Sequence, residues 1–465
     1  MRVRTLTLLL ALVTFANAQA ATDDWRAMAR AMFADVIAMP TVTERSGAKS
    51  MAEYLADTFR KSGFAEENIK VLPYGKTAAL MVRLPASGKA TARPILLIGH
   101  MDVVEALESD WSKPPFKLTE EDGYFYGRGT SDNKGGDIAQ VIALLRLRKE
   151  GFKSNRDLVL FFTGDEETDG VGATRMGGEW RSLHNAEFAL NSDEVSGQFL
   201  ANGQALGFGI QTAEKTYASF SVATHNRGGH SSKPRPDNAI YALAAVLGKL
   251  QSYRFPPIIN DTTRATLTSM IPQYPGAVGE AIRAFTSDPS DTAAADRIEN
   301  EETLIGMTRT TCVATMLSGG HAENALPQTA AATVNCRIFP GVSKESVRAA
   351  LAEVAGTDVA VEQLPGSTPE TEASPLRDDV LTAFRTAVHA RFPDVNVVPY
   401  MSSGATDGAF LRAAGIPTYC VNGLWGVVPD DERAHGRDER LLVDAFYSNL
   451  DHWHIMLTQL AGATR

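Results

Sequence analysis

The stretch ILLIGHMD, residues 95–102, decides the fold of this chain. Its first four residues form an uninterrupted apolar run, which is typical of a strand buried on both faces of a parallel sheet. His100 and Asp102 follow as soon as the run stops. Because open α/β sheets place their chemistry at strand ends, we predict that these two side chains belong to a functional site.

Other polar islands follow apolar runs in the same way. The run 158–162 precedes Glu166 and Glu167, and the run 188–190 precedes Asp193. Segments with apolar residues at helical spacing lie between these runs. The repetition of strand, polar island and helix predicts an α/β fold with a mostly parallel sheet.

The islands carry side chains that suit divalent metal ions. Imidazole and carboxylate groups are zinc ligands, and a further carboxylate beside them can transfer protons. With Asp132, which precedes a predicted helix at 137–149, and His435 near the C-terminus, the chain supplies two imidazoles and several carboxylates. We therefore predict a site for one or two zinc-like ions.

The chain has 465 residues, more than one ordinary hydrophobic core accommodates. The pattern of apolar and polar residues changes twice along it. Alternating, half-exposed strands replace the α/β pattern over 211–365. We predict a catalytic domain over 21–210 and 366–465, and a smaller α+β domain inserted at 211–365. Within the insertion, 256–300 shows no pattern that predicts its structure.

Charge and the N-terminus bear on partners and location. The net charge of −10 argues against nucleic acid as a partner, because no cluster of Lys and Arg offsets the repulsion of phosphates. Arg2 and Arg4 precede an apolar stretch and then small residues, which predicts a secretory signal peptide at 1–20 and an exported protein, periplasmic or secreted. The apolar stretch falls well short of the ~20 residues that span a membrane, and we expect no span.

Three cysteines lie far apart, each inside an apolar run: Cys312, Cys336 and Cys420. An odd number allows at most one disulfide and leaves one thiol over. Cys312 and Cys336 could pair if their strands are neighbours. Buried unpaired cysteine is the commoner state in such settings, and it is the state we expect.

The order of the islands resembles the dinuclear zinc exopeptidase family, metallopeptidase family twenty. This family contains glutamate carboxypeptidase, aminoacylase, carnosinase-type dipeptidases and succinyl-diaminopimelate desuccinylase. The resemblance covers nearly the whole chain after the signal peptide. It rests on His100-x-Asp102, Gly127-Arg128-Gly129 with Asp132, Glu166-Glu167, Asp193, Gly228-Gly229-His230-Ser231-Ser232, Asn324-Ala325-Leu326-Pro327, Arg337 with Pro340-Gly341, Ser403-Gly404-Ala405-Thr406-Asp407, and His435-Gly436.

The resemblance implies two zinc ions, with cobalt or manganese as alternatives, and five ligands: His100, Asp132, Glu167, Asp193 and His435. Asp132 would bridge the ions, with His100 and Asp193 completing one site and Glu167 and His435 the other. A bridging carboxylate offers one oxygen to each ion and offsets their repulsion. At the Asp193 position, the neighbouring Glu194 is the alternative ligand.

The resemblance also implies roles beside the ions. Glu166 would be the general base, because two adjacent acids at a strand end point in different directions. Asp102 would orient His100 without touching metal. The peptide bond between Asp132 and Asn133 would be cis.

Four residues of the resemblance point to a substrate carboxylate: Asn324, Arg337, Gly404 and Thr406. The planar fork of Arg337 matches a carboxylate, and Gly404 and Thr406 would present main chain to the same end of the substrate. His230 would donate to the oxyanion of the tetrahedral intermediate, in many relatives from the partner subunit.

Together these features predict an exported zinc-dependent exopeptidase or amidohydrolase that cleaves an amide next to a free carboxylate. Its substrate would be a small peptide or an N-acyl amino acid, so it would act as a carboxypeptidase, dipeptidase or N-acyl-amino-acid hydrolase. Dimerisation through the inserted lid domain is common among relatives. The alternative is a non-catalytic metal- or peptide-binding relative, which should have lost Glu166 or a ligand, and here none is missing. A serine hydrolase is disfavoured, because no Gly-x-Ser-x-Gly elbow is paired with a suitable acid and histidine.

Overall fold

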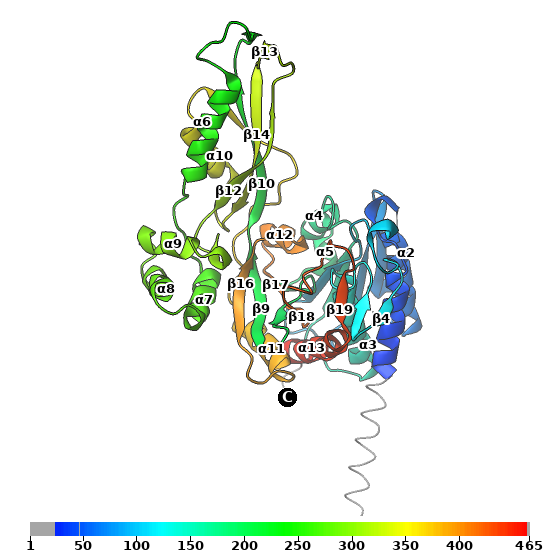
Figure 1. Ribbon diagram of the computed structural model, residues 1–465. Helices are drawn as coiled ribbons and strands as arrows, with labels where there is room; N and C mark the ends of the chain where they lie inside the picture. The colour runs from blue at the N-terminus through cyan, green and yellow to red at the C-terminus, as the bar shows by residue number, and fades with distance from the viewer. Residues whose placement is uncertain (1–23, 46, 463–465) are drawn as a thin grey trace, which may run out of the picture. The chain divides into compact units, whose positions relative to one another are not determined.

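The computed structural model describes residues 24–45 and 47–462 (Figure 1). The predicted signal peptide at 1–20 lies outside the described residues. None of the helices in the described part of the chain combines the length and apolar character that crossing a bilayer requires.

The chain divides into two compact units. Unit 1 takes in the described residues up to Ile210, together with Arg377–Val397 and the described residues from Thr418 onward, and unit 2 comprises Gln211–Leu376 and Val398–Pro417. Unit 2 thus begins at Gln211, continues past residue 365 to Leu376, and takes up a second segment, Val398–Pro417. The chain beyond 365 stays with unit 2 because the backbone N–H groups of Thr368 and Ser374 donate to the carbonyl oxygens of Tyr217 and Thr212.

A ten-stranded sheet carries the strand-end residues of the sequence analysis. Its strands are β1 (Ile69–Tyr74), β2 (Thr77–Leu84), β3 (Ile95–His100), β6 (Leu158–Thr163), β7 (Phe188–Asn191), β8 (Gly197–Phe199), β9 (Ala205–Glu214), β16 (Val397–Ser402), β17 (Thr418–Cys420) and β18 (Trp425–Val427). The order is β1-β2-β6-β3-β7-β17-β9-β8-β18, with β16 beside β9. The central strands β6, β3, β7 and β17 are parallel, and every residue of β3 and β6 is buried, as the apolar runs predict. The predicted α/β class with a mostly parallel core is confirmed.

Helices share the core of unit 1 with this sheet. They are the helix at 24–37, α2 (Gly47–Lys61), α3 (Lys134–Lys149), α11 (Asp378–His389) and α13 (Val443–Ala461). The short helices α4 (Val171–Gly177) and α5 (Arg181–His184) also belong to this unit. Nearly all residues of α3 are buried, so this helix runs through the interior with Asp132 just before its first turn. A small sheet of β4 (Thr119–Glu121), β5 (Tyr124–Tyr126) and β19 (Arg440–Leu442) completes the unit.

Unit 2 is built on an antiparallel sheet. Its strands, in spatial order, are β12 (Thr311–Gly319), β14 (Thr329–Ile338), β10 (Thr216–His225) and β15 (Val359–Gln363). The helices α6 (Ala239–Ser252) and α10 (Lys344–Ala355) share a hydrophobic core with one face of this sheet. A separate pair of short strands, β11 (Gly229–His230) and β13 (Ala325–Leu326), lies antiparallel. The short helix α12 (Asp407–Ala413) also belongs to unit 2.

The stretch 256–300, for which the sequence predicts no structure, is helical. It forms α7 (Asp261–Met270), α8 (Ala277–Ser287) and α9 (Thr292–Glu299), which enclose a small core of their own. Asn260 begins α7 with a capping box, in which its side chain accepts from the Thr263 N–H while the Thr263 hydroxyl accepts from the Asn260 N–H. The three helices have only 10, 11 and 8 residues, and Pro272, Pro275 and Pro289 interrupt the stretch, so no extended pattern marks it in the sequence. Their mutual packing buries the apolar residues.

The cysteine prediction is wrong for one pair. Cys312 and Cys336 form a disulfide, because they lie directly opposite each other in the register of β12 and β14. Sequence separation hides this neighbourhood, which is decided by strand pairing. The leftover cysteine is Cys420, which is buried and takes no part in this disulfide, as the odd count predicts.

Candidate metal centre

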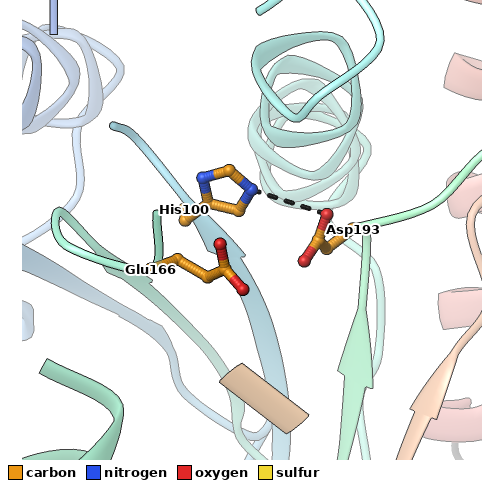
Figure 2. A group of neighbouring side chains, drawn as sticks. All are labelled: His100, Glu166 and Asp193. Atoms are coloured by element: carbon orange, nitrogen blue, oxygen red, sulfur yellow. Dashed lines mark ion pairs between the residues drawn. The ribbon is translucent and has the colours of Figure 1, made fainter. Parts of the chain in front are cut away.

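The end of β3 places His100 at the centre of an acidic cluster. Its side chain is only 1% exposed, and Nε2 lies 3.0 Å from Asp132 Oδ1 and 3.5 Å from Asp193 Oδ1. Figure 2 shows Asp193 and Glu166 pointing toward this ring from two neighbouring segments. Parallel strands that end at one sheet edge thus bring the predicted islands together, as expected.

Asp132 lies between two imidazoles. Its Oδ1 contacts His100, and its Oδ2 lies 3.2 Å from Nε2 of His435. The same His435 nitrogen lies 2.9 Å from Glu167 Oε2. One carboxylate oxygen therefore faces each half of the site, which is the arrangement that a bridging ligand needs.

The donor atoms form two overlapping groups. The ligand atoms of His100, Glu166 and Asp193 lie within 4.8 Å of one another, and so do those of His100, Asp132 and Glu167. Of the two adjacent acids, Asp193 and not Glu194 belongs to these groups. Imidazole and carboxylate donors at this spacing fit divalent ions of the zinc type.

The pKa shifts of the cluster agree with a site for positively charged ions. Burial raises the pKa of Asp193 and of Glu167. Burial acts in the same direction on Asp132, but its hydrogen bonds to His100 and His435 lower its pKa below the usual range. Hydrogen bonds to Asp132 and Glu167 raise the pKa of His435 to about 10. Positive charge is therefore stabilised at this place, and bound cations supply it as readily as protonated imidazoles.

Asp102 contacts both His100 and the loop that carries Glu166 and Glu167. It is fully buried, and its carbonyl oxygen and Oδ1 lie 3.1 Å and 3.6 Å from Nδ1 of His100. Its two carboxylate oxygens accept the backbone N–H groups of Glu166 and Glu167, at 3.2 Å and 3.0 Å. The predicted partner of His100 thus also holds the loop that carries the two glutamates, which the sequence does not indicate.

The peptide bond between Asp132 and Asn133 is cis, as the resemblance implies. Val428-Pro429 is also cis. The cis bond lies between Asp132 and the first residues of α3.

Comparisons with known proteins agree with this geometry. The family model described as Peptidase family M20/M25/M40 matches residues 96–459, well over half of the chain. The chain belongs to this family. The resemblance noted in the sequence is thereby confirmed.

Individual relatives of this M20 chain have several activities in their names. The human N-fatty-acyl-amino acid synthase/hydrolase PM20D1 is 28% identical over 429 residues, covering 88% of this chain and 83% of the relative. A probable succinyl-diaminopimelate desuccinylase of Staphylococcus aureus is 30% identical, covering 66% of this chain and 67% of the relative. The crystal structure of the M20 metallo-carboxypeptidase Sso-CP2 from Sulfolobus solfataricus has the same fold, with a TM-score of 0.67 at 18% identity, covering 93% of this chain and 99% of that one.

The M20 assignment determines the class of reaction. The chain is a metallo-hydrolase of peptide or N-acyl amino acid bonds, in a family that depends on a dinuclear metal centre. The non-catalytic alternative has no support, since the matching family is one of peptidases and the named relatives are hydrolases.

Glu439 is a site residue that the sequence analysis missed. It is fully buried, and its two oxygens accept from the backbone N–H groups of Gly129, Ser131 and Asp132 at 2.8–3.1 Å. It also accepts from Nη1 of the buried Arg128 at 2.7 Å. Gly129 has a φ of +87°, where a side chain would be strained and would press on Val103 and Lys134. Glu439 therefore holds the backbone of the loop that presents Asp132.

Asn422 plays a similar part for Asp193. Its side-chain amide donates to the carbonyl oxygens of Ser192 and Glu194 at 2.6 Å and 2.9 Å, on both sides of Asp193. The Asn422 oxygen accepts in turn from Asn449 and from the indole of Trp453. No short motif surrounds Asn422 or Glu439, so only proximity in the fold reveals them.

The predicted substrate residues all belong to unit 2. Arg337 on β14 donates to the carbonyl oxygen of Ser403 at 2.8 Å and stacks on Tyr217, 4.9 Å from the ring centre. Gly404 is the residue after Ser403, and its backbone N–H donates to Ser402 Oγ at 3.0 Å. The unit thus brings Arg337 beside the loop that contains Gly404.

Thr406 caps a helix. Its hydroxyl accepts from the Gly408 N–H at 3.0 Å at the start of α12, and it lies 3.3 Å from Glu214 Oε2. These contacts describe a positioning role for Thr406 in the 403–407 loop. Its contact with substrate stays a prediction.

His230 ends β11, and Asn324 directly precedes β13, the strand paired with it. The Ser231 N–H donates to the Asn324 carbonyl oxygen at 2.9 Å. The exposed His230 ring accepts through Nδ1 from the Ser232 N–H at 3.1 Å. In a neutral ring the proton then sits on Nε2, which can donate outward.

Proposed function

We propose that this chain is an exported hydrolase of N-acyl amino acids that uses two zinc ions and Glu166 as general base. The observation that carries the proposal is the strand-end cluster in which Asp132 lies between His100 and His435, with Glu166 beside His100. The N-acyl amino acid class is supported by the name of the human relative, which aligns with 88% of this chain.

In the proposed reaction the ions, when bound, act as Lewis acids that activate water and polarise the scissile carbonyl. Glu166 takes the proton of the attacking water and later gives it to the leaving amine. The Asp102 carboxylate accepts the backbone N–H of Glu166 and so keeps that residue in place. The Asp102 carbonyl oxygen contacts Nδ1 of His100 and so orients the imidazole. His230 donates from Nε2 to the developing oxyanion.

Removing metal is the direct test of this centre. Dialysis of the purified protein against a chelator should lower the hydrolysis of an N-acyl amino acid by more than about 100-fold, because Lewis-acid stabilisation is worth several kcal/mol. Added zinc should restore the rate, as measured by release of the free amino acid. A chelated protein that keeps its rate and holds no metal by mass spectrometry would contradict the proposal.

Arg337 is proposed to bind the free carboxylate of the substrate. Arg337→Met should lower kcat/KM for N-acyl amino acids about 10- to 100-fold, since a hydrogen bond to a charged group is worth ~1.5–3 kcal/mol. The C-terminally amidated substrate serves as the control. It should be a poor substrate of the wild type and should react equally with the variant. If the wild type hydrolysed the amidated substrate as fast as the free acid, the proposed role of Arg337 would be contradicted.

Export rests on the predicted signal peptide at 1–20. The disulfide between Cys312 and Cys336 supports it, because disulfides persist in oxidising compartments and are rare in the cytosol. Mass spectrometry of the protein from the periplasm or the medium should show a chain cleaved near Ala18 or Ala20. An uncleaved chain confined to the cytosol would contradict export.

A homodimer through unit 2 is proposed from a surface that we call the β12 patch: Ile240, Tyr241, Met316 and Leu317. The last three side chains are 68–70% exposed. β12 is an outer strand of its sheet, and such edges favour pairing with a second chain.

Charging this patch tests the dimer. Met316→Lys with Leu317→Lys should halve the mass seen by sedimentation equilibrium while leaving the melting temperature unchanged, because both side chains are exposed. Leu206→Lys is a matched control, since Leu206 is an exposed leucine of unit 1. A wild-type chain that sediments as a monomer would end the proposal.

A further inference from the structure

The C-terminal helix α13 carries a buried polar face that the proposed reaction does not use. Asn449, His452 and Trp453 lie at the helical spacing i, i+3 and i+4, and all three side chains are fully buried. Burying a polar group without a hydrogen bond costs free energy, so buried polar groups have partners. The partners of this face therefore indicate what it supports.

The partners lie in the loop between β17 and β18. Nε2 of His452 lies 2.9 Å from the carbonyl oxygen of Val421. Asn449 Oδ1 accepts from the Gly423 N–H at 2.8 Å, and Asn449 Nδ2 donates to Asn422 Oδ1 at 2.7 Å. A Cβ built on Gly423 would lie 2.4 Å from Cγ of His452, so the loop backbone packs directly against the ring. α13 thus contacts three consecutive residues of this loop.

Arg391, which follows α11, contacts the same loop and the same ring. Its Nη1 donates to the carbonyl oxygen of Gly423 at 3.0 Å, and its Nη2 lies 2.8 Å from Nδ1 of His452. A guanidinium can only donate, so Nδ1 accepts and the ring proton is on Nε2, which donates to Val421. His452 is therefore neutral in the folded protein, and both of its nitrogens have partners.

The loop held in this way carries Asn422, whose amide donates to the carbonyl oxygens on both sides of Asp193. A continuous chain of contacts therefore runs from Arg391 and His452 to the backbone around a proposed metal ligand. We propose that His452 is a positioning residue for the metal centre, which fixes Asp193 through the loop that carries Asn422. This proposal rests on the proposed function, because it takes Asp193 as a ligand.

The surroundings of His452 oppose its protonation. Among the residues that the structure describes, Arg391 is the charged side chain within hydrogen-bond distance of the ring. Asp451 precedes His452 on α13 and pairs with Arg146 at 2.8 Å, and α11 presents the ring of Phe384. Burial and then Arg391 hold the pKa of His452 well below its ordinary value, although the hydrogen bond to the backbone acts in the opposite direction. Acid pH should therefore weaken this arrangement.

The pH dependence of unfolding tests whether His452 is held neutral. An unfolded chain binds a proton at this histidine below pH ~6.5, so the stabilisation is present above that pH and is lost as the pH falls. His452→Gln removes the titrating group but keeps a donor for Val421 and an acceptor for Arg391. In metal-stripped protein, the unfolding constant of the wild type should rise about 10- to 30-fold relative to that of the variant between pH ~7.5 and ~5. All other titrating groups are the same in both proteins and cancel.

Zinc titration at pH ~7.5 tests the positioning itself. His452→Leu leaves Arg391 and Val421 without their partner, and it should weaken zinc binding about 10- to 100-fold, as changes beside metal ligands commonly do. His452→Gln should restore the affinity to within about threefold of the wild type. Ser448→Ala is the matched control and should keep the affinity. Ser448 accepts from the same Arg391 at 3.1 Å, but its own hydroxyl donates within α13 to the carbonyl oxygen of Ala445.

A double-mutant cycle tests the route through Asn422. If both residues act on Asp193 through one chain of contacts, Asn422→Ala combined with His452→Leu should weaken zinc binding at most about threefold beyond the stronger single variant. Losses that multiply would overturn this route. A folded His452→Leu protein that binds zinc like the wild type would overturn the proposal. Should that variant not fold, equal pH dependence of unfolding in the wild type and His452→Gln would overturn it.

Failure of the proposed function looks different. In that case Asp193→Ala would leave the zinc affinity unchanged, because Asp193 would not be a ligand. The pH dependence that separates the wild type from His452→Gln, measured on metal-stripped protein, would remain.

Discussion

Replacing Glu166 by glutamine should abolish nearly all hydrolysis and leave metal binding intact. We expect kcat to fall about 10²- to 10⁴-fold, the range that a positioned general base contributes. Glutamine keeps the size of the side chain, and Asp102 holds position 166 through the backbone N–H, which the substitution does not change. The loss would therefore report the missing proton acceptor.

The measurement combines turnover of an N-acyl amino acid with the metal content of the same sample. Glu167→Gln is the matched control, because it changes the adjacent residue, whose carboxylate contacts His435. That variant should lose metal as well as rate. Near wild-type turnover of Glu166→Gln would refute its role as base, and loss of metal would reassign it as a ligand.

Replacing Glu439 by alanine should destabilise the protein and impair the metal centre together. The Glu439 and Arg128 side chains are 0% and 3% exposed, so the substitution leaves a buried guanidinium without its partner. Breaking such a pair costs ~3–5 kcal/mol. The backbone N–H groups of Gly129, Ser131 and Asp132 would also lose their acceptor.

Urea unfolding and zinc titration measure the two effects. We expect a fall of ~3–5 kcal/mol in the free energy of unfolding and a weaker zinc affinity, since changes beside metal ligands commonly cost 10- to 100-fold. Glu120→Ala is the control, because Glu120 makes an exposed ion pair with Arg30 and should change stability by less than ~1 kcal/mol. An unchanged zinc affinity in a folded Glu439→Ala protein would show that the loop needs no such support.

The sequence predicts the central architecture well because strong local patterns coincide with it. The run 95–98 becomes the buried strand β3, and the periodic segment 137–149 becomes most of α3. The helices of 256–300 escape prediction because each is short. The disulfide between Cys312 and Cys336 escapes because it depends on the register of two strands.

In the candidate site, too, some residues could be predicted from the sequence and others could not. His100, Asp132, Glu166 and Asp193 come within reach of one another, because each follows or precedes an element that the sequence predicts. Glu439 and Asn422 carry no motif. They act on backbone groups that any sequence possesses, and no pattern of residue types marks them.

The sequence by itself determined the succession of strands and polar islands along the chain, the family and the donor set. The reason is that apolar periodicity and residue type are properties of short segments. The tertiary structure alone decided which distant groups support that donor set. Glu439 accepts from the N–H of Asp132 across 307 positions of sequence. It alone also decided the disulfide between Cys312 and Cys336, because strand register brings together two residues that are 24 positions apart.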